Sequence, residues 1–190
     1  MNQLRHRYEH VCVAILIAIV LASATTAFSA ESELAVHVGG EVSKPGDWTF
    51  SRIQGELASE IKSVQYASKG QSHTSNCVSL LSILKAAGVQ TELKMDPKAD
   101  PKLKNYELRL AVVVEGRDGY VATFSLAELL ADVGNRPVWL ALDVDGQPLE
   151  LRDEPMKLIV PEDQKPARWV HAIQTITVIN AASPTTQPAS

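Results

Sequence analysis

The fold is decided by the stretch LRLAVVVEGRDGYVATFS, residues 108–125. Two runs rich in β-branched residues meet there at Asp118-Gly119, and an Asp-Gly pair between such runs is a strong sign of a β-hairpin. Ser125 and Glu128 follow with the spacing of a capping box, which opens a short helix. The stretch therefore predicts two antiparallel strands and then a helix, and so a domain that mixes both kinds of element.

Five other runs are predicted strands because they are short, rich in apolar residues and bounded by turn residues. They are ELAVHVGGEV (33–42), IKSVQYAS (61–68), RPVWLALDV (136–144), MKLIVP (156–161) and RWVHAIQTITVI (168–179). We interpret the polar segment KGQSHTSN (69–76) as a short connection. Asp145-Gly146 predicts a second turn, and the lysine-rich stretch 91–105, with two Asp-Pro steps, predicts an exposed loop.

Two further helices are predicted. Ser51 and Gln54 form a capping-box pattern for a short helix that runs to Leu57. The other helix has one apolar face, formed by Leu80, Ile83, Leu84 and Ala87. Ser79 is its expected N-cap, and Gly88 suits the left-handed position that ends it. We predict an α+β domain, mostly β and partly antiparallel, with short helices at its periphery.

The first thirty residues have the order of a secretory signal peptide. A polar start with Arg5 and Arg7 precedes twelve apolar residues, VCVAILIAIVLA, and then small residues, SATTAFSA. An uncleaved anchor is the alternative, but twelve residues are short against the roughly 20 that span a bilayer. We therefore expect a signal peptide at 1–30, a periplasmic or secreted domain at 31–180 that is not held in the membrane, and a disordered tail at 181–190.

Charge and cysteine content narrow the classes of function. Without Arg5, Arg7 and Glu9, the 18 basic and 22 acidic residues of the chain fall to 16 and 21, a net charge of −5. No basic block is present, which argues against nucleic acid as a partner, because phosphate binding needs clustered cations. Cys77 is the one cysteine outside the predicted signal peptide, so no internal disulfide is expected.

Motifs that carry chemistry are scarce in this sequence. His37, His73 and His171 are far apart and match no metal-ligand spacing, which favours ordinary strand or loop histidines. Asp143 and Asp145 resemble a carboxylate pair. Because both flank a turn, we interpret them as solvated turn residues.

The segment LIVPEDQKPARWVHAI contains the best candidate for a binding site. Lys165 and Arg168 lie there between two predicted strands, where two cations and free backbone N–H groups could hold an anion such as a phosphate. The alternative is a surface loop in which both cations pair with Glu162 and Asp163. Trp169 is expected to point into the core.

The order of these features resembles the oxidoreductase molybdopterin-binding domain, which has the sulfite oxidase-type fold, and in particular its short exported bacterial members. VHVGGEVSKPGDW, CVSLLSILKAAGV, the DGY hairpin and the run RPVWLALDVDGQPLELRDEPMKLIVPEDQKPARWVHAIQTITV carry the resemblance. It extends over residues 34–179. No single motif is specific, and the resemblance rests on their order and spacing taken together.

The resemblance implies a molybdenum-ligating cysteine on the loop after the strand 61–68, near Ala67 or Ser68, and neither residue can supply a thiolate. Cys77 takes the place of a glycine of the family immediately before the helix. Lys165 and Arg168 match the loop that contacts the phosphate of the pterin, so the resemblance implies that they bind cofactor. Molybdopterin is thus possible, yet we expect no bound cofactor and no catalytic residue.

Two hypotheses of different class follow. The first is an exported module without molybdenum catalysis that binds a small anionic ligand or a periplasmic protein partner. The second is a molybdopterin-dependent oxidoreductase with Cys77 as an atypical metal ligand. A third possibility is a subunit that docks on a redox partner. Under the first hypothesis, Cys77 is structural and at least partly buried.

Overall fold

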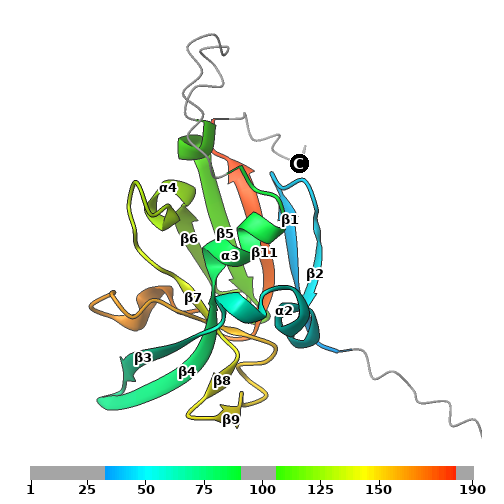
Figure 1. Ribbon diagram of the computed structural model, residues 1–190. Coiled ribbons are helices and arrows are strands. Elements are labelled where there is room, and N and C mark those ends of the chain that lie inside the picture. Colours follow the sequence, from blue (N-terminus) through cyan, green and yellow to red (C-terminus); the bar gives the residue numbers. More distant parts are fainter. Residues whose placement is uncertain (1–32, 91–105, 183–190) are drawn as a thin grey trace, which may run out of the picture. The chain divides into compact units, whose positions relative to one another are not determined.

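The computed structural model describes residues 33–90 and 106–182, and the following elements lie in that part of the chain (Figure 1). In chain order they are β1 (Ala35–Gly40), β2 (Gly46–Thr49), α2 (Phe50–Glu56), η1 (Ala58–Glu60), β3 (Lys62–Ser68), β4 (Gln71–Ser79), α3 (Leu80–Ala86), η2 (Tyr106–Arg109), β5 (Leu110–Gly116), β6 (Val121–Ser125), α4 (Leu126–Leu129), β7 (Trp139–Ala141), β8 (Asp143–Val144), β9 (Gln147–Pro148), β10 (Lys157–Ile159), η3 (Pro166–Arg168) and β11 (Ile173–Asn180). The predicted signal peptide, the predicted loop at 91–105 and all but the first two residues of the predicted tail lie outside the described residues.

A five-stranded sheet has the order β2-β1-β11-β5-β6. The hairpin β5–β6 is present as predicted, with Gly119 in a left-handed conformation at its turn. Side chains of β5 alternate between the core and the outer face, so that Val112 and Val114 are fully buried. The last strand, β11, pairs antiparallel with β5 and parallel with β1. The first and the last strand of the described domain therefore lie side by side in this sheet.

The second sheet has four strands in the order β10-β7-β4-β3. Our interpretation of residues 69–76 as a connection is wrong, because β3 and β4 form a long hairpin that turns at Lys69 and Gly70. Cys77 therefore lies within a strand, opposite Lys62 on one side and Ala141 on the other. The hairpin β8–β9 turns at the predicted Asp145-Gly146 pair.

Of the N-terminal caps predicted for α2, α3 and α4, two are confirmed. Ser79 caps α3 by accepting a hydrogen bond from the Ser82 N–H, and Ser125 and Glu128 form the predicted capping box of α4. The predicted capping box at Ser51 is wrong, because Thr49 is the N-cap of α2 and accepts from the Arg52 N–H. A threonine two residues earlier serves equally well, since either hydroxyl can satisfy a free N–H of the first turn.

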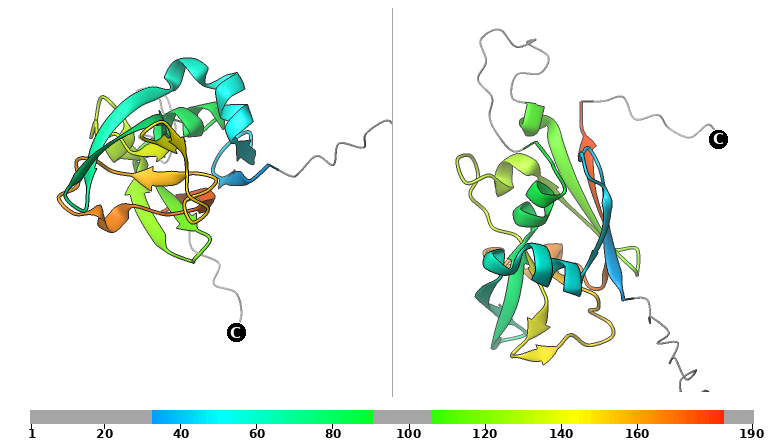
Figure 2. Two further views of the ribbon diagram at one scale, coloured as in Figure 1. Left: turned by 90° about the horizontal axis from the view of Figure 1, so that it is seen from below. Right: turned by 45° about the vertical axis from the view of Figure 1, so that its right-hand side comes forward.

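The core lies between the two sheets and the helices α2 and α3, which cover the same face of the five-stranded sheet (Figures 1 and 2). Its largest fully buried side chains come from every layer and include Trp48, Ile53, Leu80, Ile83, Phe124, Leu140 and Leu158. Each such aliphatic side chain contributes about 1.5–3 kcal/mol by leaving water. The predicted α+β, mostly β class is confirmed. No helix among residues 33–90 and 106–182 is long and apolar enough to cross a membrane.

Candidate functional site

The structure places Arg168 in a network of ion pairs. Its guanidinium donates two hydrogen bonds to Asp163, at 2.7 and 2.8 Å, and lies 3.4 Å from the Glu128 carboxylate and 4.8 Å from the Phe124 ring centroid. The hydrogen bonds from Arg168 hold the pKa of Asp163 below its usual value. Lys165 is exposed beside η3. The geometry of Arg168 is that of a residue that ties the loop before η3 to α4.

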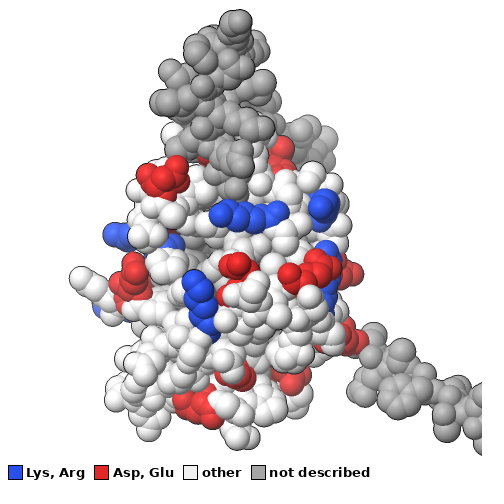
Figure 3. All heavy atoms as spheres, in the orientation of Figure 1, with Lys and Arg blue, Asp and Glu red and all other residues white. Residues whose placement is uncertain are grey.

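Trp169 is buried, as predicted, and its indole N–H donates to the Val160 carbonyl at 3.3 Å. Acidic and basic side chains are interspersed over the face of the molecule in Figure 3. A mixed face of this kind does not have the clustered cations that binding to nucleic acid requires.

Cys77 is fully buried, which confirms the expectation of a buried residue. Its thiol contacts the Ser75 carbonyl oxygen at 3.5 Å. Removal from water raises the pKa of the Cys77 thiol to about 12, and the nearby Asp143 carboxylate acts in the same direction. Because the thiolate is the form that attacks and binds metals, Cys77 has the properties of a packing residue.

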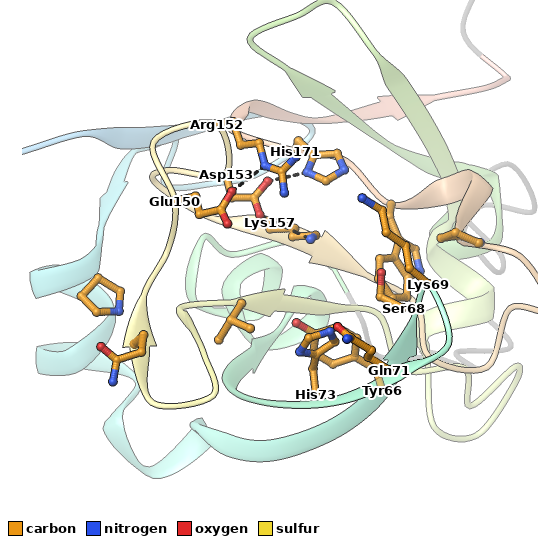
Figure 4. A pocket seen from close by; sticks show the side chains of 15 residues that line it. Tyr66, Ser68, Lys69, Gln71, His73, Glu150, Arg152, Asp153, Lys157 and His171 are labelled. Carbon is orange, nitrogen blue, oxygen red and sulfur yellow. Dashed lines mark hydrogen bonds and ion pairs between the residues drawn. The ribbon is translucent and has the colours of Figure 1, made fainter.

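A cleft of about 610 Å³ lies between the β3–β4 hairpin, the β8–β9 hairpin and the segments on either side of β10 (Figure 4). Figure 4 shows Glu150, Arg152, Asp153, Lys157 and His171 gathered on one side of it. We call these five residues the charged cluster. Neither Lys165 nor Arg168 lines this cleft, although their neighbours Pro166 and Trp169 do.

A buried carboxylate organises the charged cluster. Asp153 has 6% of its side chain exposed, and its two oxygens face the Lys157 ammonium at 3.4 Å and the His171 Nδ1 atom. The Lys157 side chain is only 11% exposed, and its Nζ atom lies 5.8 Å from the Trp169 ring centroid. Asp153 thus compensates a buried cation at the floor of the cleft and orients the imidazole, leaving Nε2 of His171 free of that contact.

The outer part of the charged cluster is a second ion pair of different character. Arg152 Nε lies 2.8 Å from the Glu150 carboxylate, with 65% and 71% of the two side chains exposed. Such exposed pairs are screened by water and contribute about 0–1 kcal/mol. Arg152 therefore can exchange Glu150 for another anion at little cost, whereas Lys157 is held in place. Arg152 and His171 also border a second hollow of about 530 Å³.

The opposite side of the cleft is aromatic and polar. Tyr66 meets the Trp169 ring edge-on at 5.3 Å and the His73 ring at 5.6 Å, and its hydroxyl contacts the Ser75 Oγ atom at 3.3 Å. His73 Nδ1 contacts the Asp145 carboxylate at 2.8 Å. The hydrogen bonds from His73 and from the Thr74 N–H lower the pKa of Asp145.

The three histidines share one arrangement that the sequence did not reveal, since each contacts an aspartate through Nδ1. The interpretation of Asp145 as a merely solvated turn residue is too simple. Asp143 and Asp145 accept hydrogen bonds from the backbone N–H groups of Asn76 and Thr74, and so satisfy the edge of β4. Among the described residues, no group of three or more histidine, cysteine or acidic side chains is arranged to hold a metal ion.

The residues present do not fit a molybdenum centre of the kind that the family resemblance implies. Ser68, at one of the two positions where that resemblance implies the ligating cysteine, lines the cleft, but a hydroxyl does not replace a soft thiolate. Cys77 is absent from the described lining of the cleft and is buried within the sheet. We therefore derive no chemical step through molybdenum.

Comparison with solved structures finds the fold of the described domain in part of a larger protein of known structure. One of the similar solved chains is that of the sulfane dehydrogenase SoxCD from Paracoccus pantotrophus, with a TM-score of 0.50 and 18% sequence identity. The match covers 77% of this chain but 38% of the dehydrogenase chain, and at this identity it bears on the fold alone. No family model and no curated protein matches the sequence.

Proposed function

We propose that this domain is a ligand-binding module built on a molybdopterin oxidoreductase-like fold, which binds a small anionic molecule in the cleft without molybdenum catalysis. The observation that carries the proposal is the buried ammonium of Lys157 at the cleft floor. A charge that is nine-tenths buried is costly, and such groups concentrate where a protein binds or transforms a ligand.

The second candidate is a molybdopterin-dependent oxidoreductase with Cys77 as its metal ligand, favoured by the likeness to the sulfane dehydrogenase. Burial of Cys77 and the rise of its pKa to about 12 oppose it. In this second candidate, Lys165 and Arg168 would bind the phosphate of the cofactor. It would require Arg168 to leave two carboxylates for a phosphate.

Metal analysis of protein produced in a host that makes the cofactor separates the two candidates. We expect no stoichiometric molybdenum in the wild type, and native mass spectrometry should show no pterin. Molybdenum at one equivalent that is lost in Cys77→Ser would refute the binding-module proposal. Val78→Ala is the matched control, because it disturbs the packing beside Cys77 and keeps the sulfur; metal that survives Val78→Ala but is lost in Cys77→Ser is held by the thiol.

We also propose that the domain works outside the cytoplasm, because the first thirty residues have the order of a signal peptide. A periplasmic protein partner is the alternative occupant of the cleft. Fractionation of the native host should recover, in the periplasm or medium, a chain whose first residue follows Ala24 or Ala27. A full-length chain retained in the cytoplasm would contradict this.

A further inference from the structure

We propose that the ligand of the cleft is a hydroxylated monocarboxylic acid, such as a sugar acid, whose carboxylate binds Arg152, Lys157 and His171 in place of Glu150. The inference rests on the proposed function and specifies its ligand. In this proposal the charged cluster binds the carboxylate of the ligand, and the rest of the cleft binds its hydroxylated body.

The charge of the cleft favours a monoanion. Among the described residues that line it, three are cationic and two acidic, namely Lys69, Arg152 and Lys157 against Glu150 and Asp153. With the histidines counted as neutral, one net positive charge remains, because Glu150 still lines the cleft after it releases Arg152 to the ligand. A carboxylate matches that charge, whereas a phosphate monoester carries about −1.5 to −2 charges at neutral pH and would leave the cleft with excess negative charge.

Of the two acids in the charged cluster, a ligand can displace Glu150 but not Asp153. Asp153 is buried against Lys157 and His171, and its removal would strand a buried ammonium. The Glu150 side chain is 71% exposed, and its carboxylate pairs with the exposed Arg152. An incoming carboxylate can replace Glu150 on the Arg152 guanidinium, because a guanidinium can bind a carboxylate through two parallel hydrogen bonds. Glu150 is thus an internal competitor of the ligand.

The size and lining of the rest of the cleft call for an uncharged polar body. A volume of about 610 Å³ is far larger than one carboxylate needs, and it lies within the range of pockets for small organic molecules. The uncharged polar side chains Ser68, Gln71 and Gln147 also line the cleft. Hydroxyl and amide groups both donate and accept hydrogen bonds, so they suit a ligand that carries several hydroxyls.

The test is isothermal titration calorimetry of the purified protein at pH 7 and low salt with four probes. These are D-glucuronate, D-gluconate, D-glucose and D-glucose 6-phosphate. We expect at least one of the two acids to bind, glucose to show no measurable binding, and glucose 6-phosphate to bind more weakly than the better acid. Glucose that binds as well as the acids would overturn the inference.

Variants at the exposed pair give a sharper readout, because neither side chain contributes to the core. Glu150→Gln should tighten binding of the better acid about twofold to fivefold, since it removes a competitor held by an exposed ion pair. Arg152→Gln should weaken binding about tenfold, since a charged hydrogen bond is lost. Lys85→Gln, an exposed cation on α3 away from the cleft, is the matched control and should bind like the wild type. Unchanged or weaker binding in Glu150→Gln would overturn the role of Glu150.

The failure of this inference can be told apart from failure of the proposed function. If glucose 6-phosphate binds more tightly than both acids and Arg152→Gln weakens it, the cleft binds anions and only the monocarboxylate assignment is overturned. If none of the anionic probes binds, and inorganic phosphate at high concentration causes no shift in the NMR signals of cleft residues, both proposals are overturned.

Discussion

Replacing Asp153 by asparagine tests how the charged cluster is held together. The change keeps the shape of the side chain and removes its charge, so the Lys157 ammonium is left at the cleft floor without a counter-ion. Removing one partner of a buried pair costs about 3–5 kcal/mol. Lys157 keeps 11% of its side chain in solvent, and the new amide can still accept a hydrogen bond, so we expect the lower end, about 3 kcal/mol.

The same reasoning predicts that a second change rescues the first. Lys157→Met removes the stranded ammonium and places a thioether against the Trp169 ring, a contact that sulfur makes favourably. Because replacing both members of a buried pair is often neutral or stabilising, Asp153→Asn with Lys157→Met should be at least about 1 kcal/mol more stable than Asp153→Asn alone.

Urea denaturation at pH 7, followed by tryptophan fluorescence, measures these differences, provided that the slope of unfolding free energy against denaturant stays constant. Glu150→Gln is the control. It breaks an exposed pair in the same segment and should change stability by less than about 0.5 kcal/mol. If Asp153→Asn costs no more than this control, or if the two changes simply add, the account of the buried pair is wrong.

Three further predictions concern other parts of the domain. Cys77 should resist alkylation at pH 8 in the native protein and react once the chain is unfolded, as peptide mapping can show; rapid native modification would contradict its raised pKa of about 12. Arg168 lowers the pKa of Asp163, so the stability that their pairing contributes is fully present above the ordinary aspartate pKa and is lost as the pH falls through the lowered value. Arg168→Gln should therefore lose less unfolding free energy than the wild type when the pH is lowered. An unchanged dependence of stability on pH would refute this. Gly88→Ala should lower stability by at least about 1 kcal/mol, because its φ is +80° and a Cβ would lie 1.9 Å from Ser43 Oγ, and thermal unfolding at the wild-type midpoint would contradict it.

The sequence predicts those elements whose signals are local. The Asp118-Gly119 hairpin, the Ser79 cap and the left-handed Gly88 each depend on residues that lie a few positions apart. The strand β3 is predicted as the run 61–68, but β4 and the hairpin that it forms with β3 escaped prediction for two reasons. The turn of the hairpin places Lys69, a residue with a Cβ, at φ 52°, and β4 is rich in serine and threonine.

What holds β4 in place comes from distant parts of the chain. Asp143 and Asp145 bind its backbone N–H groups from 67 and 71 residues away, and β7 pairs with its end. No periodicity within residues 71–79 reports such contacts, because the polar side chains are satisfied by tertiary partners. A hairpin of this composition is therefore indistinguishable from a loop until the sheet that supports it is known.

The candidate site escaped prediction for a related reason. Lys165 and Arg168 stood out because two cations lie close together in one loop, but Arg168 holds that loop to α4. Arg152 and Lys157 each have an acid within four residues, so in the sequence they look neutralised. Only the structure shows that one of these acids is buried beneath its cation while the other is exposed beside it.

Because Asp153 is buried and Glu150 is exposed, the contribution of the charged cluster to stability can be tested separately from its contribution to binding. A buried ion pair is weak support for a fold, since apolar residues of the same volume serve as well or better. What Asp153 supplies is a fixed position for the Lys157 ammonium, which reduces the ordering that a ligand must otherwise bring about. Asp153→Asn with Lys157→Met should consequently recover stability and still fail to bind the acid that the wild type binds. A variant that recovered both would show that the buried pair serves neither purpose.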